Sequence, residues 1–93
     1  MFWVYILKCS DGSYYTGHTD NLELRMAQHV SGYFPGCYTS SRLPLHLVYS
    51  QEIDTREAAL SAERQIKGWS RKKKEALIRG DWEAVSFWSK RRF

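Results

Sequence analysis

Residues 2–19 read FWVYILKCSDGSYYTGHT, and this stretch decides the fold. Aromatic and β-branched residues, which favour strands, dominate residues 2–9 and recur over 14–19. Residues 10–13, SDGS, lie between the two runs and are typical of a hairpin loop. The sequence therefore predicts two antiparallel strands joined by a short turn.

The length of this turn decides whether two tyrosines share one face of the sheet. A two-residue loop at 11–12 puts Tyr5 and Tyr15 on opposite faces, because side chains alternate along a strand. A three-residue loop at 10–12, with Gly12 in the left-handed region, puts both tyrosines on one face. The sequence permits both registers. We predict the three-residue loop, because it is the one that brings the two tyrosines together.

Capping residues predict a helix directly after the hairpin. Asp20 can cap it, Glu23 completes a capping box, and Gly32 ends it. Its apolar positions recur every fourth residue, at Leu22, Met26 and Val30. The remaining predicted elements are a strand over 45–49, a helix from Asp54 or Thr55 to about Gly68, a helix over 71–79 capped by Ser70, and a short helix after Asp81. This order, ββαβαα plus a short C-terminal helix, predicts an α+β fold with a small three-stranded antiparallel sheet flanked by helices.

Length and composition indicate one domain over residues 1–93, with a core over about 2–79 and an aromatic and basic extension over 80–93. The hydrophobic share of 43% and charged share of 26% exclude disordered and collagen-like classes. No apolar run approaches the ~20 residues of a membrane span, and the start lacks the features of a signal peptide. Cys9 and Cys37 lack the number and spacing of a disulfide framework or a metal site. We therefore expect reduced thiols and a cytoplasmic location.

Positive charge is concentrated in the last third of the chain. Residues 1–63 hold four basic and seven acidic side chains, whereas residues 64–93 hold ten basic and three acidic ones. Residues 71–74, RKKK, begin a predicted helix, where cations oppose the helix dipole. This placement favours contacts with phosphate over a merely solvated surface. The charge pattern predicts a polyanionic partner.

Three further side chains are candidates for catalysis. Arg25 and His29 lie four residues apart at the border of the predicted apolar stripe; a guanidinium suits a phosphate and a histidine exchanges protons near neutral pH. The alternative is a pair at the helix surface. Glu63 falls within an apolar arc of its helix, where a carboxylate is costly unless it is paired or binds a metal. Both explanations stay open, with Arg25 or Lys67 as the pairing partner and Mg²⁺ as the metal.

Together these segments resemble the GIY-YIG nuclease superfamily, in particular its small stand-alone bacterial proteins. The matching motifs are, in order, Trp3-Val4-Tyr5, Tyr15-Thr16-Gly17, Asn21-Leu22-Glu23-Leu24-Arg25 with His29, Tyr38-Thr39 ahead of Arg42-Leu43-Pro44, and Ala62-Glu63-Arg64-Gln65-Ile66-Lys67. The resemblance spans residues 3 to about 79. Four positions depart from the family pattern: Trp3-Val4 replaces Gly-Ile, Thr16 replaces Ile, and Cys37 stands where relatives often have a lysine.

The resemblance implies an endonuclease that hydrolyses phosphodiester bonds in nucleic acid, with DNA as the expected substrate and DNA repair as an expected role. It implies one Mg²⁺ (or Mn²⁺) ion held by Glu63 and no small-molecule cofactor. Arg25 would neutralise a phosphate oxygen, while Tyr5 and His29, supported by Tyr15, would orient or deprotonate the attacking water. The expected nucleic-acid contacts are Tyr38, Arg42, Lys67, Arg71, Lys72, Lys73 and Lys74.

Two other functions stay open on the sequence alone. A nucleic-acid-binding module without catalysis would keep the basic residues but would not need Glu63. A protein-interaction domain would use exposed aromatic residues near the C-terminal end, namely Trp82, Phe87 and Trp88, although we expect these to cover the core. Salt-sensitive binding of nucleic acid would separate the nuclease and the nucleic-acid-binding module from the protein-interaction domain.

Overall fold

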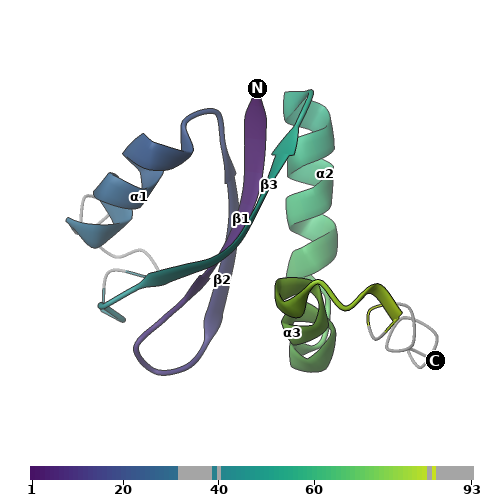
Figure 1. Ribbon diagram of the computed structural model, residues 1–93. Coiled ribbons are helices and arrows are strands. Elements are labelled where there is room, and N and C mark those ends of the chain that lie inside the picture. The colour runs from purple at the N-terminus through teal and green to yellow at the C-terminus, as the bar shows by residue number, and fades with distance from the viewer. Residues whose placement is uncertain (32–38, 40, 84, 86–93) are drawn as a thin grey trace.

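The computed structural model describes residues 1–31, 39, 41–83 and 85. Its elements are β1 (Phe2–Lys8), β2 (Tyr14–Thr19), α1 (Leu22–Val30), β3 (His46–Ile53), α2 (Arg56–Lys67) and α3 (Arg71–Arg79). This is the predicted α+β order ββαβαα (Figure 1). Among the described residues, no helix is long and apolar enough to cross a membrane.

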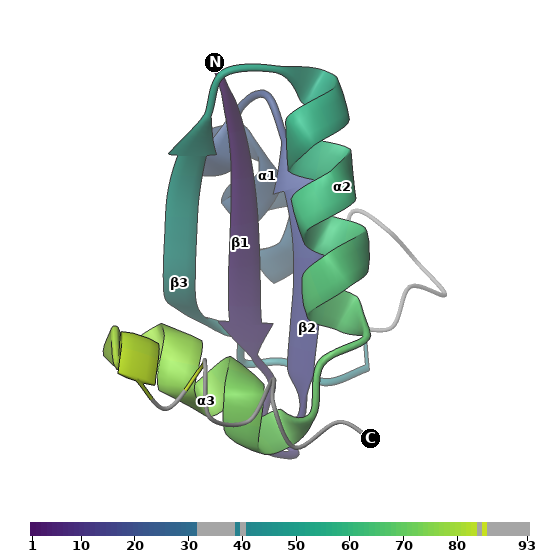
Figure 2. The same cartoon turned by 90° about the vertical axis from the view of Figure 1, so that its right-hand side faces the viewer.

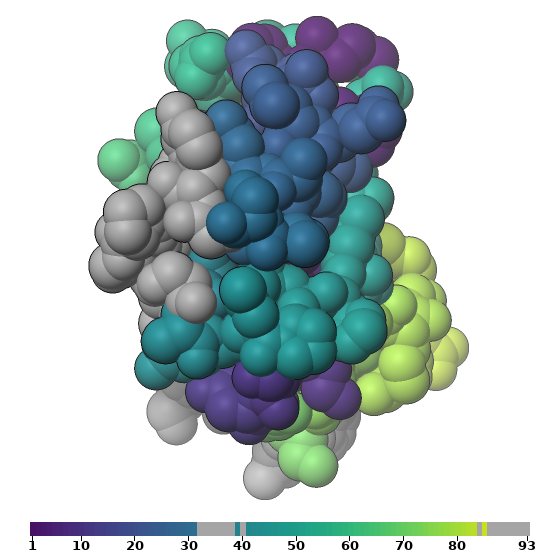
Figure 3. Space-filling view, turned by 90° about the vertical axis from the view of Figure 1, so that its left-hand side faces the viewer, coloured from purple at the N-terminus to yellow at the C-terminus, as the bar shows by residue number. Residues whose placement is uncertain are grey.

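The three strands form one antiparallel sheet in the order β2-β1-β3, so β1 is central and β2 is an edge strand (Figure 2). Helix α1 covers one face of the sheet, and α2 and α3 lie on the other (Figure 1). Figure 3 views the molecule from the α1 side, where α1 covers the upper part of the sheet. The edge strand β2 therefore has one helix layer on each side.

The hairpin between β1 and β2 has the predicted three-residue loop. Leu7 pairs with Tyr15 across the strands, and Gly12 has a φ of 84°, a conformation that glycine adopts without steric cost. The backbone N–H of Gly12 donates to the carbonyl of Cys9 at 2.9 Å. This register puts Tyr5 and Tyr15 on the α1 face, as predicted.

Alternation along β1 divides the core between the two faces of the sheet. Val4 and Ile6 pack toward α2 and α3, whereas the buried Tyr5 and Leu7 belong to the α1 face. Val85 joins the cluster around Val4 and Ile6, which also contains Ile66, Ala76 and Leu77. Burying these side chains supplies the main stabilisation of the fold.

The C-terminal aromatic residues were expected to cover the core, and for Trp82 this expectation is wrong because its side chain is exposed. Val85 covers the core in its place, and its N–H donates to the carbonyl of Asp81 at 3.0 Å. Phe87 and Trp88, which belonged to the same prediction, lie outside the described residues.

Helix boundaries correct the sequence-based prediction at α1. Asn21, not Asp20, is the N-cap, because its side chain accepts a hydrogen bond from the N–H of Leu24 at 3.0 Å. This position of the cap rules out the capping box expected with Glu23. The helix ends at Val30 with Ser31 as C-cap, before Gly32.

The other boundaries lie closer to the prediction. Thr55 caps α2 by accepting from the N–H of Ala58 at 3.1 Å, and Ser70 caps α3 as predicted. Strand β3 runs over His46–Ile53 and is longer than the predicted 45–49. The extra residues pair with the start of β1, where Phe2 lies opposite Ile53.

Candidate active site

Two groups of polar side chains lie around the edge strand β2, one on each face of the sheet. Successive residues of the strand point to opposite faces. Tyr15 and Gly17 therefore belong to the α1 face, and Thr16 and His18 belong to the α2 face. The hydrogen bonds of each group show what chemistry it can support.

The group on the α1 face contains a buried chain of hydrogen bonds, here called the buried relay. The hydroxyl of Tyr5 lies 3.0 Å from Nε2 of His29, and Nδ1 of His29 lies 3.0 Å from Oγ1 of Thr39. All three residues are no more than 2% exposed. His29 was expected at the border of the helix stripe. That expectation is wrong, because His29 is buried and Val30 of the stripe is exposed.

Local structure explains how Thr39 reaches the relay. The N–H of Arg42 donates to the carbonyl of Thr39 at 3.1 Å, which closes a turn. The N–H of Ser10 in the hairpin loop donates to the carbonyl of Arg42 at 2.9 Å. The segment that carries Thr39 is thus attached to the β1–β2 hairpin, whose tyrosine it supports through His29.

Gly17 gives the hydroxyl of Tyr5 room at the edge of the sheet. The two residues are cross-strand neighbours. A Cβ atom at Gly17 would lie 2.5 Å from the Tyr5 hydroxyl oxygen and 2.7 Å from the adjacent ring carbon. Both distances are far below van der Waals contact, so any side chain at this position would displace the Tyr5 ring.

The electrostatics of the α1 face keep the relay neutral. Burial raises the pKa of Tyr5, and the neighbouring Tyr15 raises that pKa further. The charge of Arg25 and its hydrogen bond to Tyr5 act in the opposite direction. Burial lowers the pKa of His29, as does the charge of Arg25. Near neutral pH a neutral phenol therefore lies beside a neutral imidazole, with Arg25 as the adjacent cation.

Tyr15 lies between the two groups. Its ring centroid is 6.4 Å from that of Tyr5 and 5.4 Å from that of His29. The ammonium of Lys67 on α2 lies 5.9 Å from the same ring centroid, within the range of a cation–π interaction. Tyr15 therefore contacts both the relay and a side chain of the α2 face.

Glu63 is the centre of the group on the α2 face. Its Oε1 accepts a 2.6 Å hydrogen bond from Nδ1 of His18, and its Oε2 lies 3.0 Å from the ammonium of Lys67. The side chain is 12% exposed. Burial acts to raise the pKa of Glu63, but the hydrogen bonds from His18 and Lys67 outweigh it, so the pKa is lowered. Glu63 is therefore an ionised carboxylate with Lys67 as a pairing partner, one of the two that we considered.

The carboxylate of Glu63 can also be tested as a metal ligand. No cluster of three or more His, Cys, Asp or Glu side chains occurs in the described parts of the chain. An ionised carboxylate has about four acceptor positions, and the interactions with His18 and Lys67 leave room on each oxygen. The site therefore fits Mg²⁺, which accepts one or two carboxylates and completes its shell with water and phosphate.

The basic residues of α3 differ from one another in their surroundings. Lys73 is 6% exposed, and its ammonium lies 3.9 Å from the centroid of the Trp69 ring. Arg71 donates to the carbonyl of Gly12 at 2.8 Å and lies 3.1 Å from the carboxylate of Glu75. Lys72 is exposed and Lys74 is partly buried. The run at 71–74 is therefore not a uniform charged surface.

Two further residues, Arg42 and Tyr38, were predicted to contact nucleic acid. Arg42 donates from Nε to the carboxylate of Asp11 at 3.0 Å, which connects it to the β1–β2 loop. Tyr38 lies outside the described residues.

Sequence reasoning did not anticipate His18 or Thr39 as part of the site. His18 directly follows the motif Tyr15-Thr16-Gly17, and its alternation with Tyr15 could have placed it on the opposite face. Finding its partner also required knowing that α2 packs on that face. No sequence pattern around Thr39 predicts its contact with His29. The contact depends on the turn in which the Thr39 carbonyl accepts from the N–H of Arg42.

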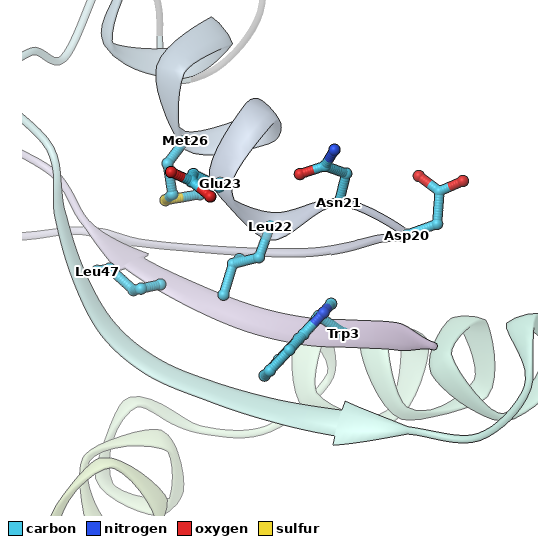
Figure 4. A pocket seen from close by; sticks show the side chains of 7 residues that line it. All are labelled: Trp3, Asp20, Asn21, Leu22, Glu23, Met26 and Leu47. Atoms are coloured by element: carbon cyan, nitrogen blue, oxygen red, sulfur yellow. The ribbon is translucent and has the colours of Figure 1, made fainter.

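A pocket of about 490 Å³ lies at the other end of α1, lined by Trp3, Asp20, Asn21, Leu22, Glu23, Met26 and Leu47. Figure 4 shows Trp3, Leu22 and Leu47 directed toward the space between α1 and the sheet, with Asp20 and Asn21 directed away from it. Its charged residues are acidic, so it does not suit a phosphate.

Comparison with known proteins gives consistent matches. The family model described as the GIY-YIG catalytic domain matches residues 1–76. A UPF0213 protein of Natronomonas pharaonis is 44% identical over 77 residues, which cover 82% of this chain and 88% of the relative. A UPF0213 protein of Staphylococcus aureus is also 44% identical over 77 residues, covering 83% and 93%.

Two solved structures are similar to the fold. The solution NMR structure of a UPF0213 protein from Bacillus halodurans has a TM-score of 0.55 and 39% identity, covering 91% of this chain and 94% of that one. The solution NMR structure of a protein from E. faecalis has a TM-score of 0.58 and 34% identity, covering 84% and 82%.

Proposed function

This chain belongs to the family of GIY-YIG catalytic domains, and from that premise we propose that it is an endonuclease that hydrolyses phosphodiester bonds in DNA with one Mg²⁺ (or Mn²⁺). The observation that carries the proposal is the arrangement around β2. A neutral tyrosine–histidine pair with an adjacent arginine lies on one face of the strand, and an ionised glutamate lies on the other. Phosphodiester hydrolysis needs a proton acceptor for water and positive charge at the phosphate.

The buried relay supplies the proton acceptor. As the oxygen of the attacking water forms its bond to phosphorus, the bond from phosphorus to the leaving 3′ oxygen of the strand breaks, and that oxygen takes a proton from solvent. The hydroxyl oxygen of Tyr5 takes a proton from the attacking water. The phenolic proton of Tyr5 passes at the same time to Nε2 of His29, 3.0 Å away. This transfer avoids a free tyrosinate, which the raised pKa of Tyr5 would make costly.

This transfer needs the tautomer of His29 that carries its proton on Nδ1, and the hydroxyl oxygen of Thr39 offers that proton an acceptor. When Nδ1–H of His29 donates to Oγ1 of Thr39, Nε2 has a free lone pair for the proton of Tyr5. The hydrogen bond from Arg25 to Tyr5 supports the same arrangement. Arginine can only donate, so the phenol oxygen accepts from Arg25 while its own proton points toward His29.

Arg25 and Glu63 act on the phosphate. Arg25 neutralises a non-bridging oxygen, for which a planar guanidinium is suited. Glu63, held by His18 and Lys67, would be the protein ligand of the ion. When bound, Mg²⁺ supplies stabilisation of the negative charge that develops on the phosphate.

One observation favours a second candidate function, a nucleic-acid-binding module without catalysis. Both oxygens of Glu63 already have protein partners, which is also what a purely structural ion pair requires. Such a module would bind DNA but would have no use for the relay.

The decisive assay incubates the protein with labelled single-stranded, duplex and branched DNA, in Mg²⁺ and in EDTA. We expect cleavage of at least one substrate in Mg²⁺ and none in EDTA. Binding of every substrate without cleavage in Mg²⁺ or Mn²⁺ would favour the module, and equal cleavage in EDTA would refute the role of the ion. A role in DNA repair and a cytoplasmic location stay predictions from the sequence.

A further inference from the structure

A second pocket lies beside the candidate active site and is lined by residues of β2, α2 and α3. The start of β2, the end of α2 and the start of α3 meet at one corner of the fold (Figure 2). Its volume is about 410 Å³, and its lining residues are Tyr14, Tyr15, Thr16, Lys67 and Lys74. It shares Tyr15 and Lys67 with the site. The lining contains two cations and no carboxylate, so its charge suits an anion.

Lys74 is held in this pocket without a counter-charge. Burial alone lowers its pKa, and among the described residues no carboxylate forms an ion pair with it. Its basic neighbours differ, because Arg71 pairs with Glu75 and Lys67 pairs with Glu63. A partly buried ammonium without a partner is unfavourable, and an anionic ligand would remove that cost.

Thr16 provides an independent observation on the same pocket. Its Oγ1 is buried and has no hydrogen-bond partner among the residues that the structure describes, a rare condition in folded proteins. A valine, which has nearly the same shape as threonine, would leave no unpartnered group at this position. The chain therefore places a hydroxyl where packing alone would favour a hydrocarbon.

We infer that this pocket binds a phosphate group of the nucleic-acid strand next to the phosphate that is cut, with Lys74 as its counter-charge and Thr16 as a hydrogen-bond donor. The inference rests on the proposed function for the identity of the strand, but the binding itself needs no catalysis. Because Oγ1 of Thr16 is closed off from solvent, the proposal requires a side chain of the pocket to shift when the phosphate enters. Lys67 then separates this phosphate from Glu63.

The first experiment compares Lys74→Met with Arg79→Met, which removes one positive charge from an exposed position on the same helix. DNA affinity is measured in EDTA over a series of salt concentrations. We expect Lys74→Met to weaken binding about tenfold and to reduce the slope of log affinity against log salt by about one, with Arg79→Met close to the parent. Equal effects of the two variants would overturn the proposal.

The second experiment compares Thr16→Val with Thr19→Val on the same strand. The hydroxyl of Thr19 is hydrogen-bonded to the backbone of Asn21, whereas that of Thr16 has no partner within the described parts of the chain. Thr16→Val is expected to keep or raise the melting temperature of the free protein and to weaken DNA binding at least threefold. Thr19→Val is expected to lower the melting temperature. A Thr16→Val protein that binds DNA like the parent would overturn the role of the hydroxyl.

Inorganic phosphate separates the two sources of the anion. If the site serves the strand, a DNA oligonucleotide raises the melting temperature of the parent more than that of Lys74→Met at concentrations where phosphate alone has no effect. The assignment to the strand would be overturned if free phosphate raised the melting temperature of the parent while DNA raised that of the parent and of Lys74→Met equally. Because all measurements are made without metal, a Lys74 effect in a protein that never cuts DNA would support the subsite while the proposed function failed.

Discussion

The two faces of β2 carry groups of opposite character. On the α1 face, Tyr5, His29 and Thr39 are buried, neutral and connected by hydrogen bonds. On the α2 face, His18 and Lys67 surround an ionised carboxylate that solvent still reaches. One edge strand separates the two, and Gly17, which bears no side chain, lies between them.

The difference in burial determines what each group can do. A buried neutral relay holds a proton path in fixed geometry, but it cannot neutralise a phosphate. An ionic group that solvent still reaches can exchange one of its partners for an ion or a substrate. Under the proposed function, proton transfer falls to the α1 face, and charge neutralisation falls to the α2 face together with Arg25.

Removing the carboxylate of the α2 face should have the largest effect. We expect Glu63→Gln to lower the rate of DNA cleavage about 1,000-fold or more while DNA affinity holds or rises, because a negative charge near phosphate has been removed. Mg²⁺ should raise the melting temperature of the parent and not of the variant. Glu57→Gln, at an exposed position of the same helix, is the control. A Glu63→Gln protein that melts early yet still cuts DNA would show that the residue is only an ion-pair partner.

Arg25 tests whether the α1 face also touches the phosphate. Arg25→Lys keeps the charge but loses the planar fork of donors. The expected loss of cleavage rate is about 100-fold to 1,000-fold with an unchanged melting temperature, measured against Arg64→Lys on the exposed side of α2. If Arg25→Lys cleaves like the parent, the guanidinium serves only to orient Tyr5.

Gly17→Ala tests the separation between the two faces directly. The new Cβ would overlap the hydroxyl of Tyr5, so the ring must move away from the edge. We expect a stability loss of ~1–3 kcal/mol and a cleavage rate about 100-fold lower. The control is Gly68→Ala, whose nearest neighbour, a backbone oxygen of Gln65, would lie at 3.6 Å. A Gly17→Ala enzyme of normal rate would mean that the position of Tyr5 is not critical.

Thr39 should have the smallest effect, and it is visible in the pH profile. Cleavage needs neutral His29, whose pKa burial lowers below its ordinary value of 6.5. The parent should therefore stay active below pH 6.5 and lose activity as the pH falls further and His29 becomes protonated.

Thr39→Val removes the acceptor for the Nδ1–H of His29. It therefore disfavours both the productive tautomer of His29 and its protonated form. We expect a plateau rate about tenfold lower and an acid limb shifted to lower pH, with both restored in Thr39→Ser. A lower rate with an unshifted acid limb, or no rescue by serine, would show that Thr39 contributes packing only.

The sequence predicted the hairpin register and the start of α3, because the relevant signals are local. Gly12 is compatible with the three-residue turn that brings Tyr5 and Tyr15 to one face, and Ser70 marks the start of α3. The error at α1 has a similar local origin, since Asp20 and Asn21 are both good caps and sequence alone did not separate them.

The remaining features depend on which elements pack together. The burial of His29 follows from the packing of α1 and of the segment around Thr39, and it reverses the expectation from helix periodicity. The partnership of His18 with Glu63 follows from α2 lying on the far face of β2. Lys73 was predicted to contact nucleic acid as one of a basic run, but its side chain is buried and its ammonium lies against the Trp69 ring.

The central claim is that the two faces of β2 act on one phosphate. A crystal structure of the protein with DNA, in which Ca²⁺ replaces Mg²⁺ to slow cleavage, tests it most directly. The account predicts one phosphate that contacts both the guanidinium of Arg25 and a single ion held by Glu63, with a water between that phosphate and the hydroxyl of Tyr5. A DNA strand bound along α2 and α3, with Arg25 and Tyr5 distant from every phosphate, would contradict it.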